Sequence, residues 1–253
     1  MSQQQKAMLI IMDGWGINKN PKSSAIEAAN TQFTDSLYLK YPNTGLLTHG
    51  EYVGLPEDQM GNSEVGHMNL GAGRVVYQDL MLINKKVQTG ELDKNDVLLA
   101  AFEYAKKQNK KVHFIGLISD GGIHSHINHL KALIKSAKEN GVEKSFVHAF
   151  TDGRDTDPKS GLRFIEDLDN YCASTPTKIA SVCGRYYAMD RDKRWERIKL
   201  AYDLLVHGEG DKFSSSVEGV KASYAKDVTD EFIKPIIITD SEAKAIEIGR
   251  AHV

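Results

Sequence analysis

The stretch VHFIGLISDGGIH, residues 112–124, sets the fold class of this chain. Apolar residues dominate its first half, and its second half is polar and glycine-rich, which predicts a buried β-strand followed by a loop. The same pattern recurs in FVHAFTDGRD, residues 146–155, and in KIASVCGRYY, residues 178–187. Helices predicted at residues 125–139 and 158–173 separate these strands. Strands that alternate with helices predict an α/β fold with a mainly parallel sheet.

Outward from this core, the periodicity of apolar residues predicts further elements on both sides. Ser24 is a candidate cap for the first of the helices. The remaining predicted elements are strands at residues 7–12, 45–49 and 236–239, and helices at residues 25–39, 79–88, 95–107 and 193–206.

A glycine-rich segment, DQMGNSEVGHMNLGAGR at residues 58–74, centres on Ser63. Glycines let the backbone turn tightly and present N–H groups to an anion, so Ser63 is a candidate nucleophile. The spacing differs from the nucleophile elbow of α/β-hydrolases, and the segment lacks the lysine of a P-loop. The structural alternative is that Ser63 is the N-cap of a helix. We expect a helix to begin here, and its N-terminus would favour a phosphoryl group on the serine.

Asp13 follows the apolar run at residues 7–12 and precedes Gly14. Ligands of α/β sheets collect at the carboxyl ends of strands, so a carboxylate at this position is a candidate metal ligand. The alternative is an ordinary turn residue, because Asp-Gly is common in turns.

Polar side chains follow the three central strands, where they should meet at one edge of the sheet. Arginine donates forked hydrogen bonds that match carboxylate and phosphate groups, which predicts a site for a small anion. For any single arginine the alternative is a solvated surface charge. The candidates are His124, Arg154, Asp155, Arg185 and Arg191.

Three histidines lie close together in sequence at 124, 126 and 129, which raises the alternative of a zinc site. No carboxylate or cysteine completes a recognisable zinc spacing there. His124 is nearest the end of the predicted strand, so we expect it to be functional, and we expect His126 and His129 to be structural.

Five motifs occur in order along the chain: LIIMDGWG, GNSEVGHMNLGAGR, SDGGIHSH, TDGRDTDP and GRYYAMDRD. Together they resemble the cofactor-independent (2,3-bisphosphoglycerate-independent) phosphoglycerate mutases, which are metal-dependent members of the alkaline phosphatase superfamily. The resemblance extends from about residue 6 to about residue 240 and covers only the amino-terminal part of such an enzyme.

The resemblance implies interconversion of 3-phosphoglycerate and 2-phosphoglycerate in glycolysis and gluconeogenesis, through a phosphoserine intermediate on Ser63. It implies two divalent metal ions, manganese with magnesium as the alternative, and no requirement for 2,3-bisphosphoglycerate. Serine is a weak nucleophile at neutral pH, and coordination to a cation is the physical route to its alkoxide. Asp13 and Ser63 match metal ligands of the family, and the substrate would be bound by His124, Arg154, Asp155, Arg185 and Arg191.

The resemblance also implies two domains. Residues 1–76 would begin a discontinuous phosphatase-type metal-binding domain, which is incomplete here. Residues 77–253 would form an inserted α/β phosphotransferase domain that binds the substrate, truncated at its C-terminal end. The last residues, EIGRAHV at 247–253, match a translated sequencing adapter better than the family. We therefore expect a truncated fragment that is inactive alone.

Composition narrows the class of protein. The 253 residues carry a net charge of −2, which gives no sign of a nucleic-acid or membrane surface. Two cysteines, Cys172 and Cys183, indicate buried thiols in a reducing compartment. No signal peptide or transmembrane stretch is evident, so we expect a cytoplasmic protein. The balanced charge favours a small-molecule substrate over a macromolecular partner, and we expect a monomer. Two rival functions remain: a metal-dependent phosphomonoester hydrolase of the same superfamily, or a non-catalytic anion-binding module at residues 77–253.

Overall fold

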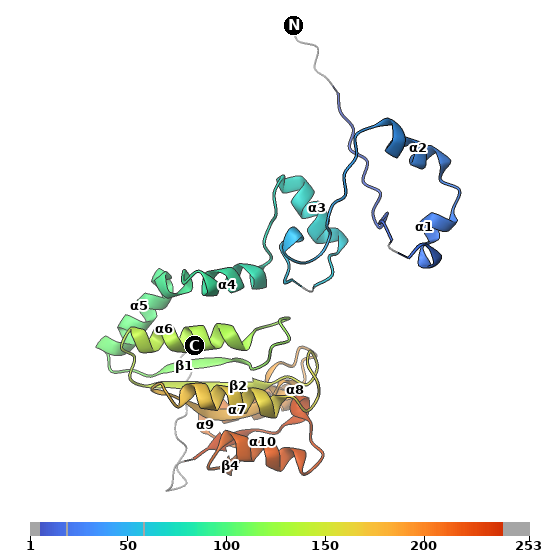
Figure 1. The fold of residues 1–253 in the computed structure, drawn as a ribbon. Helices are drawn as coiled ribbons and strands as arrows, with labels where there is room; N and C mark the ends of the chain where they lie inside the picture. Colours follow the sequence, from blue (N-terminus) through green and yellow to red (C-terminus); the bar gives the residue numbers. More distant parts are fainter. Residues whose placement is uncertain (1–5, 19, 58, 240–253) are drawn as a thin grey trace. The chain divides into compact units, whose positions relative to one another are not determined.

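The computed structural model describes residues 6–18, 20–57 and 59–239. The chain divides into two compact units, Met1–Gln78 and Asp79–Val253 (Figure 1). Residues 247–253, for which we expected a sequencing artefact, lie outside the described residues. None of the described helices is long and apolar enough to cross a membrane.

The first unit consists of short helices, with no sheet among its described residues. The predicted helix at residues 25–39 is split into α1 (Ala25–Ala28) and α2 (Gln32–Lys40), because Ala29 adopts an extended conformation. Ser24 caps α1 as predicted, since its side chain accepts a hydrogen bond from the Glu27 N–H. The unit also contains η1 (Pro21–Ser23), η2 (Gly50–Val53) and α3 (Ser63–Ala72), and its small core comprises Val53, Leu55 and Val65.

Two strands predicted in the first unit are absent from its described part. Residues 7–12 have no regular secondary structure, and Met8 is 85% exposed. Residues 45–49 form only an isolated bridge between His49 and Met60. The apolar pattern marked segments that favour burial, but a strand forms only against a neighbour that pairs its N–H and C=O groups. The described residues of this unit supply no such neighbour.

The second unit contains a five-stranded sheet in the order β1-β2-β3-β5-β4. The three predicted strands β1 (Val112–Leu117), β2 (Ser145–Thr151) and β3 (Thr177–Gly184) are parallel neighbours. β5 (Ile236–Ile238) runs antiparallel to β3 and parallel to β4 (Asp211–Phe213). The predicted α/β class and mainly parallel sheet are confirmed. β4 was missed because it is only three residues long and begins with two charged side chains.

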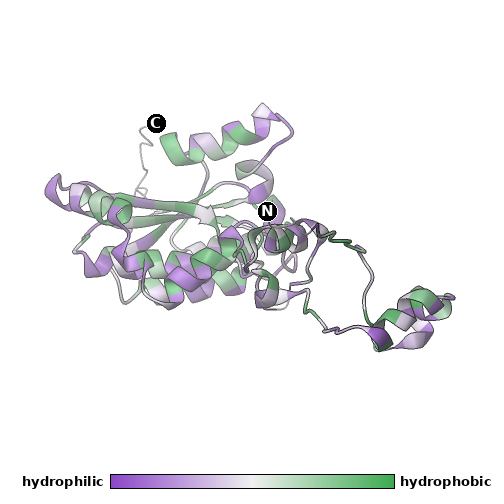
Figure 2. Ribbon diagram, turned by 90° about the horizontal axis from the view of Figure 1, so that it is seen from above, coloured by the Kyte–Doolittle hydropathy of each residue, from purple (hydrophilic) through white to green (hydrophobic). Residues whose placement is uncertain are grey.

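Helices cover both faces of this sheet (Figure 1). α6 (Ile127–Glu139), α7 (Gly161–Cys172) and α10 (Ser216–Tyr224) pack on one face, and α9 (Trp195–His207) packs on the other. β5 shows why both faces are apolar, because Ile236 and Ile238 join the first core and Ile237 joins the second. Hydrophobic residues predominate along the sheet, whereas the helices mix hydrophobic and hydrophilic residues (Figure 2).

Two further helices, α4 (Asp79–Gln88) and α5 (Asp96–Lys107), precede the sheet in sequence. Phe102 of α5 packs against Ala137 of α6. All the helices predicted in this unit are present with ends within three residues of the prediction, but α10 was not predicted.

Cys172 and Cys183 are buried and free, as expected for core thiols. Burial raises the pKa of each thiol to about 12. Both side chains therefore stay protonated at neutral pH and act as apolar packing groups.

A late segment of the chain supports the carboxyl ends of the central strands. The turn η4 (Asp230–Phe232) lies against β2, since Thr151 Oγ1 donates to the Asp230 carbonyl oxygen over 2.7 Å. The Gly184 N–H at the end of β3 donates to the Ile233 carbonyl oxygen, also over 2.7 Å. The loops that carry the predicted binding residues thus follow strand ends that are held in place by hydrogen bonds to residues 230–233.

Candidate functional site

Ser63 is the first residue of α3, at the positively polarised end of the helix. The helix begins here because Asn62 caps it, with Oδ1 accepting a hydrogen bond of 3.0 Å from the Val65 N–H. Ser63 is therefore not the cap, and its hydroxyl is available for other contacts. Gly61 permits a close approach of the chain, because a Cβ there would lie 1.8 Å from the Thr48 carbonyl oxygen.

Asp13 and Ser63 are in direct contact, although they lie 50 positions apart in sequence. Ser63 Oγ donates a hydrogen bond to Asp13 Oδ2 over 2.6 Å. A tight turn positions the carboxylate: the Trp15 N–H bonds to the Met12 carbonyl oxygen at 3.1 Å, and Gly14 has a φ of 76°. The turn, and not the end of a strand, therefore brings Asp13 to the serine.

His67 lies one helical turn after Ser63 and contacts it twice. His67 Nδ1 is 2.8 Å from the Ser63 carbonyl oxygen and 3.2 Å from Ser63 Oγ. A carbonyl oxygen only accepts, so the shorter contact places the proton on Nδ1. Asp13 is then the acceptor that remains for the serine hydroxyl.

The pair Asp13 and Ser63 supplies two oxygen donors that fit a hard divalent cation. Ligand oxygens bind Mg²⁺ at about 2.1 Å, so adjacent octahedral ligands lie about 3 Å apart. The observed 2.6 Å between Oγ and Oδ2 needs only a small widening to reach that value. The donor set is partial, because no three His, Cys, Asp or Glu side chains gather into a metal site in the described part of the chain.

The second unit has a pocket of about 460 Å³ at the loops that follow β1, β2 and β3. α8 (Arg185–Ala188) and η4 complete its wall. All five residues predicted to bind the substrate line this pocket: His124, Arg154, Asp155, Arg185 and Arg191. The topology thus brings these side chains together, while their role in binding stays a prediction.

Arg185 is fixed at the base of this pocket by two carboxylates. Its Nη1 lies 2.7 Å from Asp152 Oδ1 and 2.6 Å from Asp155 Oδ2. The Arg185 side chain is 7% exposed and that of Asp152 is 2% exposed. Because both ion pairs use Nη1, the Nε and Nη2 groups of Arg185 are left to donate to a ligand.

Asp152 organises the loop around Arg185. Its carboxylate accepts hydrogen bonds from the Ser119 hydroxyl and from the backbone N–H groups of Arg154 and Asp155. Burial by itself raises the pKa of Asp152, but the hydrogen bonds from Asp155, Ser119, Arg185 and Arg154 outweigh it and lower that pKa. The carboxylate is therefore ionised and fully bonded at neutral pH.

Arg154 and His124 have looser contacts. Arg154 Nη2 pairs with Glu231 Oε1 at 2.9 Å, and the Arg154 side chain is 57% exposed. His124 Nε2 lies 3.7 Å from Asp155 Oδ2. Both side chains can therefore adjust to a ligand.

The remaining arginines of the pocket differ from one another. The Arg191 side chain lines the pocket without a hydrogen bond or ion pair to any described residue. Arg197 pairs with Asp190 at 3.3 Å, and its guanidinium lies 4.0 Å from the ring centroid of Tyr186. Arg197 is thus held by a charge and by a cation–π contact.

The two neighbouring histidines have structural contacts. His126 is the N-cap of α6, with its side chain accepting from the Asn128 N–H. His129 Nε2 contacts Asn84 Oδ1 at 2.5 Å, and burial together with the charge of His126 lowers the pKa of His129. These contacts agree with the structural role expected for both, and no zinc site is found among the described residues.

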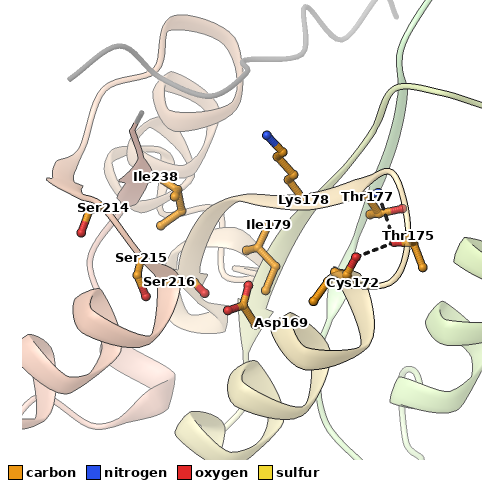
Figure 3. Close-up of a pocket in the computed structure, with 11 residues that line it drawn as sticks. Asp169, Cys172, Thr175, Thr177, Lys178, Ile179, Ser214, Ser215, Ser216 and Ile238 are labelled. Atoms are coloured by element: carbon orange, nitrogen blue, oxygen red, sulfur yellow. Dashed lines mark hydrogen bonds between the residues drawn. The ribbon is translucent and has the colours of Figure 1, made fainter. Parts of the chain in front are cut away.

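A second pocket, of about 400 Å³, lies at the opposite end of β3, between α7 and the start of α10 (Figure 3). None of the predicted site residues lines it. Ser215 already caps α10 by accepting from the Val217 and Glu218 N–H groups, and the Asp169 carboxylate faces the same space.

Sequence reasoning missed several residues that build the arginine pocket. Asp152 could have been predicted, since it is the first acidic residue of the TDGRD loop that follows a predicted strand. Glu231 and Arg197 could not have been predicted from the sequence, because only the folded chain brings η4 and α9 to the loops after β2 and β3.

Comparisons with known proteins identify the family of the chain. Residues 83–251 match the model of the family described as BPG-independent PGAM N-terminus. The match continues beyond residue 240, so our expectation that the resemblance fades there was wrong. Since the match ends at residue 251, it also includes most of the terminal stretch 247–253 that we had set apart from the family.

Individual relatives extend the similarity over most of the chain. It is 60% identical over 242 residues to a 2,3-bisphosphoglycerate-independent phosphoglycerate mutase of Flavobacterium johnsoniae, covering 96% of this chain and 48% of the relative. A mutase of the same description from Myxococcus xanthus is 50% identical, with 97% and 48% covered. The chain thus spans about half the length of the curated relatives it matches.

A solved structure shows the same fold. A phosphoglycerate mutase of Leishmania mexicana, crystallised at low cobalt concentration, superimposes with a TM-score of 0.69 at 35% identity. The likeness covers 89% of this chain and 43% of that one.

Proposed function

Since the chain belongs to the family of BPG-independent phosphoglycerate mutases, we propose that the full-length protein interconverts 3-phosphoglycerate and 2-phosphoglycerate through a phosphoserine on Ser63. No 2,3-bisphosphoglycerate is required in this scheme. Residues 1–76 would belong to the metal-binding phosphatase-type domain, and residues 77–253 to the phosphotransferase domain that binds the substrate.

The observation that carries the proposal is the hydrogen bond from Ser63 Oγ to Asp13 Oδ2. A carboxylate acceptor orients the serine hydroxyl and favours loss of its proton. The unpaired N–H groups in the first turn of α3 and the helix dipole then stabilise negative charge on a phosphoryl group at this position. Ser63 therefore has both the activation and the anion stabilisation that a phosphoryl acceptor needs.

Asp13 Oδ2 and Ser63 Oγ are the groups that would hold a divalent cation, manganese with magnesium as the alternative. A bound cation of this kind lowers the pKa of an attached hydroxyl and neutralises charge that develops during phosphoryl transfer. The complete enzyme would hold two such ions. Because the described residues bring together only two donors, we infer that the 253-residue chain is inactive alone.

Substrate recognition is assigned to the arginine pocket of the second unit. Arg154, Arg185 and Arg191 would bind the carboxylate and phosphate groups as forked donors. Asp155 would orient Arg185 and, with His124, contact the glycerate. The phosphoryl group passes to Ser63, the glycerate reorients, and the group returns to the other hydroxyl, so no water is consumed. Such transfer depends mainly on positioning and charge stabilisation.

Phosphopeptide mass spectrometry of the full-length protein, after brief exposure to 3-phosphoglycerate, tests this function. We expect the phosphate on the peptide that contains Ser63, and no labelled peptide in Ser63→Ala. A phosphate on any other residue would reject the assignment of Ser63.

The products in the same reaction distinguish the rival hydrolase. A mutase yields 2-phosphoglycerate with no release of inorganic phosphate, whereas a phosphomonoester hydrolase releases phosphate and glycerate. The arginine pocket favours the mutase, because a hydrolase does not need to retain the glycerate after the phosphoryl group has left.

A further inference from the structure

The arginine pocket contains as many carboxylates as arginines. The positively charged lining residues are Arg154, Arg185, Arg191 and Arg197. The negatively charged ones are Asp155, Asp190, Asp192 and Glu231. A phosphoglycerate ion adds a carboxylate and a phosphate, which together carry between two and three negative charges near pH 7. An empty pocket of balanced charge does not attract such an ion strongly. Arg191 has no internal partner among the described residues and can bind the ligand directly, and an arginine released from an internal partner would supply a further donor.

Two of the arginines are held too firmly to be released. Arg185 is almost fully buried and bonded to two carboxylates. Arg197 is stacked on Tyr186, and the side chain of its partner Asp190 is only 1% exposed. Breaking a buried ion pair leaves an uncompensated charge, at a cost of several kcal/mol. These two residues are part of the fixed wall.

Arg154 is different, because its single ion pair joins a mobile partner to a fixed one. The Arg154 side chain is 57% exposed, whereas that of Glu231 is 14% exposed. Glu231 belongs to η4, whose neighbouring Asp230 is fully buried and accepts a hydrogen bond from the Gly161 N–H. The arginine can therefore swing away from the glutamate, but the glutamate cannot follow it.

We propose that Glu231 is an internal competitor for the ligand: it holds Arg154 in the empty pocket and gives up the guanidinium to an anionic group of the phosphorylated ligand. This inference rests on the proposed function in taking phosphoglycerate as that ligand.

Calorimetric titration of the 253-residue chain with 3-phosphoglycerate tests the role of Glu231. Glu231→Gln keeps the shape of the side chain and removes the competing charge. We expect its dissociation constant to fall about threefold to tenfold, as for the loss of a partly exposed ion pair and of one like charge near the ligand. Glycerate, which lacks the phosphate and carries less negative charge, should gain less than 3-phosphoglycerate, because removal of the competitor helps only a ligand that takes Arg154.

Matched variants separate competition from a general change of charge. Asp192→Asn removes one charge from the same pocket without releasing an arginine. We expect it to lower the dissociation constant for 3-phosphoglycerate less than Glu231→Gln does. Glu166→Gln removes a charge that pairs with Lys221 at 3.2 Å away from this pocket, and should leave binding unchanged. In an Arg154→Met background the gain from Glu231→Gln should shrink to the smaller gain expected for Asp192→Asn, because only the loss of a like charge then remains. Glu231→Asp, which withdraws the carboxylate from Arg154, should fall between wild type and Glu231→Gln.

The possible outcomes distinguish this inference from the proposed function. Equal or weaker binding by Glu231→Gln, with wild-type binding intact, would overturn the competitor role and leave the function standing. Absence of binding by wild type and by Glu231→Gln would overturn both. Thermal unfolding of each variant shows whether a loss of binding reflects a loss of folding.

Discussion

The Asp152 carboxylate and the Arg185 guanidinium form a buried ion pair at the base of the arginine pocket, 2.7 Å between Oδ1 and Nη1. The pair holds the loop after β2 to the first residue of α8. It therefore joins two of the three strand ends that build the pocket.

Truncation of Asp152 should be strongly destabilising. Asp152→Ala leaves Arg185 buried with one partner fewer and removes the acceptor of the Ser119 hydroxyl, so we expect the free energy of unfolding to fall by about 3–5 kcal/mol. Asp167→Ala, which breaks an exposed pair with Lys131, should cost about 1 kcal/mol or less. Urea denaturation of the two variants measures their free energies of unfolding. Equal decreases in the two variants would show that the Asp152–Arg185 pair is not desolvated.

The stability of the protein should depend on pH through His148. This side chain is buried in β2 between His113 and Ser181, and burial together with the charge of His113 lowers the pKa of His148 from 6.5 to about 4. Protonation is thus less favourable in the folded state. Stability from this group is fully present above pH 6.5 and is lost as the pH falls toward 4, by about 3 kcal/mol.

Comparison with His148→Gln tests this pH dependence. The variant has lower stability throughout, because it loses hydrogen bonds, but its free energy of unfolding should change less between pH 6.5 and pH 4. Parallel curves for the two proteins would contradict a role of His148 in the pH dependence.

A methyl group at Gly184 should displace η4 from the sheet. A Cβ there would lie 2.3 Å from the Glu231 carbonyl oxygen and 2.7 Å from the Ile233 nitrogen. We expect Gly184→Ala to lower the free energy of unfolding by about 3 kcal/mol and to weaken binding of 3-phosphoglycerate. Gly116→Ala in β1 is the control, because a Cβ at that site meets nothing within 4 Å, and its stability should be unchanged or slightly raised.

Loss of the Asp13 charge should impair catalysis by the full-length enzyme. Asp13→Asn keeps the size of the side chain but removes a charged oxygen beside Ser63, so we expect kcat to fall at least about a hundredfold with saturating manganese. Asp35→Asn changes an exposed carboxylate of α2 that bonds only Thr31, and should retain full activity. Comparable activity of Asp13→Asn and wild type would remove Asp13 from the metal site.

The 253-residue chain should show no mutase turnover under the same conditions, while it still binds 3-phosphoglycerate. A coupled assay of 2-phosphoglycerate formation measures this. Turnover by the purified chain would show that Asp13 and Ser63 suffice without further metal ligands.

The sequence predicted the second unit well because its signals are local. Each apolar run from β1 to β3 is long enough to identify a buried strand, and the following glycines identify the loop. The same approach failed for residues 7–12, whose apolar pattern is equally clear. A strand depends on a neighbour as well as on its own residues, and no neighbour is present in the described part of the first unit.

By itself, the sequence determined the α/β class, the start of a helix at Ser63 and the five residues that meet in the arginine pocket. Those features follow from patterns within a few residues and from the rule that parallel strands end at one edge. Only the tertiary structure decided that Asp13 reaches Ser63 from a turn, that Asp152 fixes Arg185 and that Glu231 pairs with Arg154. Each of these contacts joins residues far apart in sequence, and their energy depends on a separation and a burial that the folded chain alone defines.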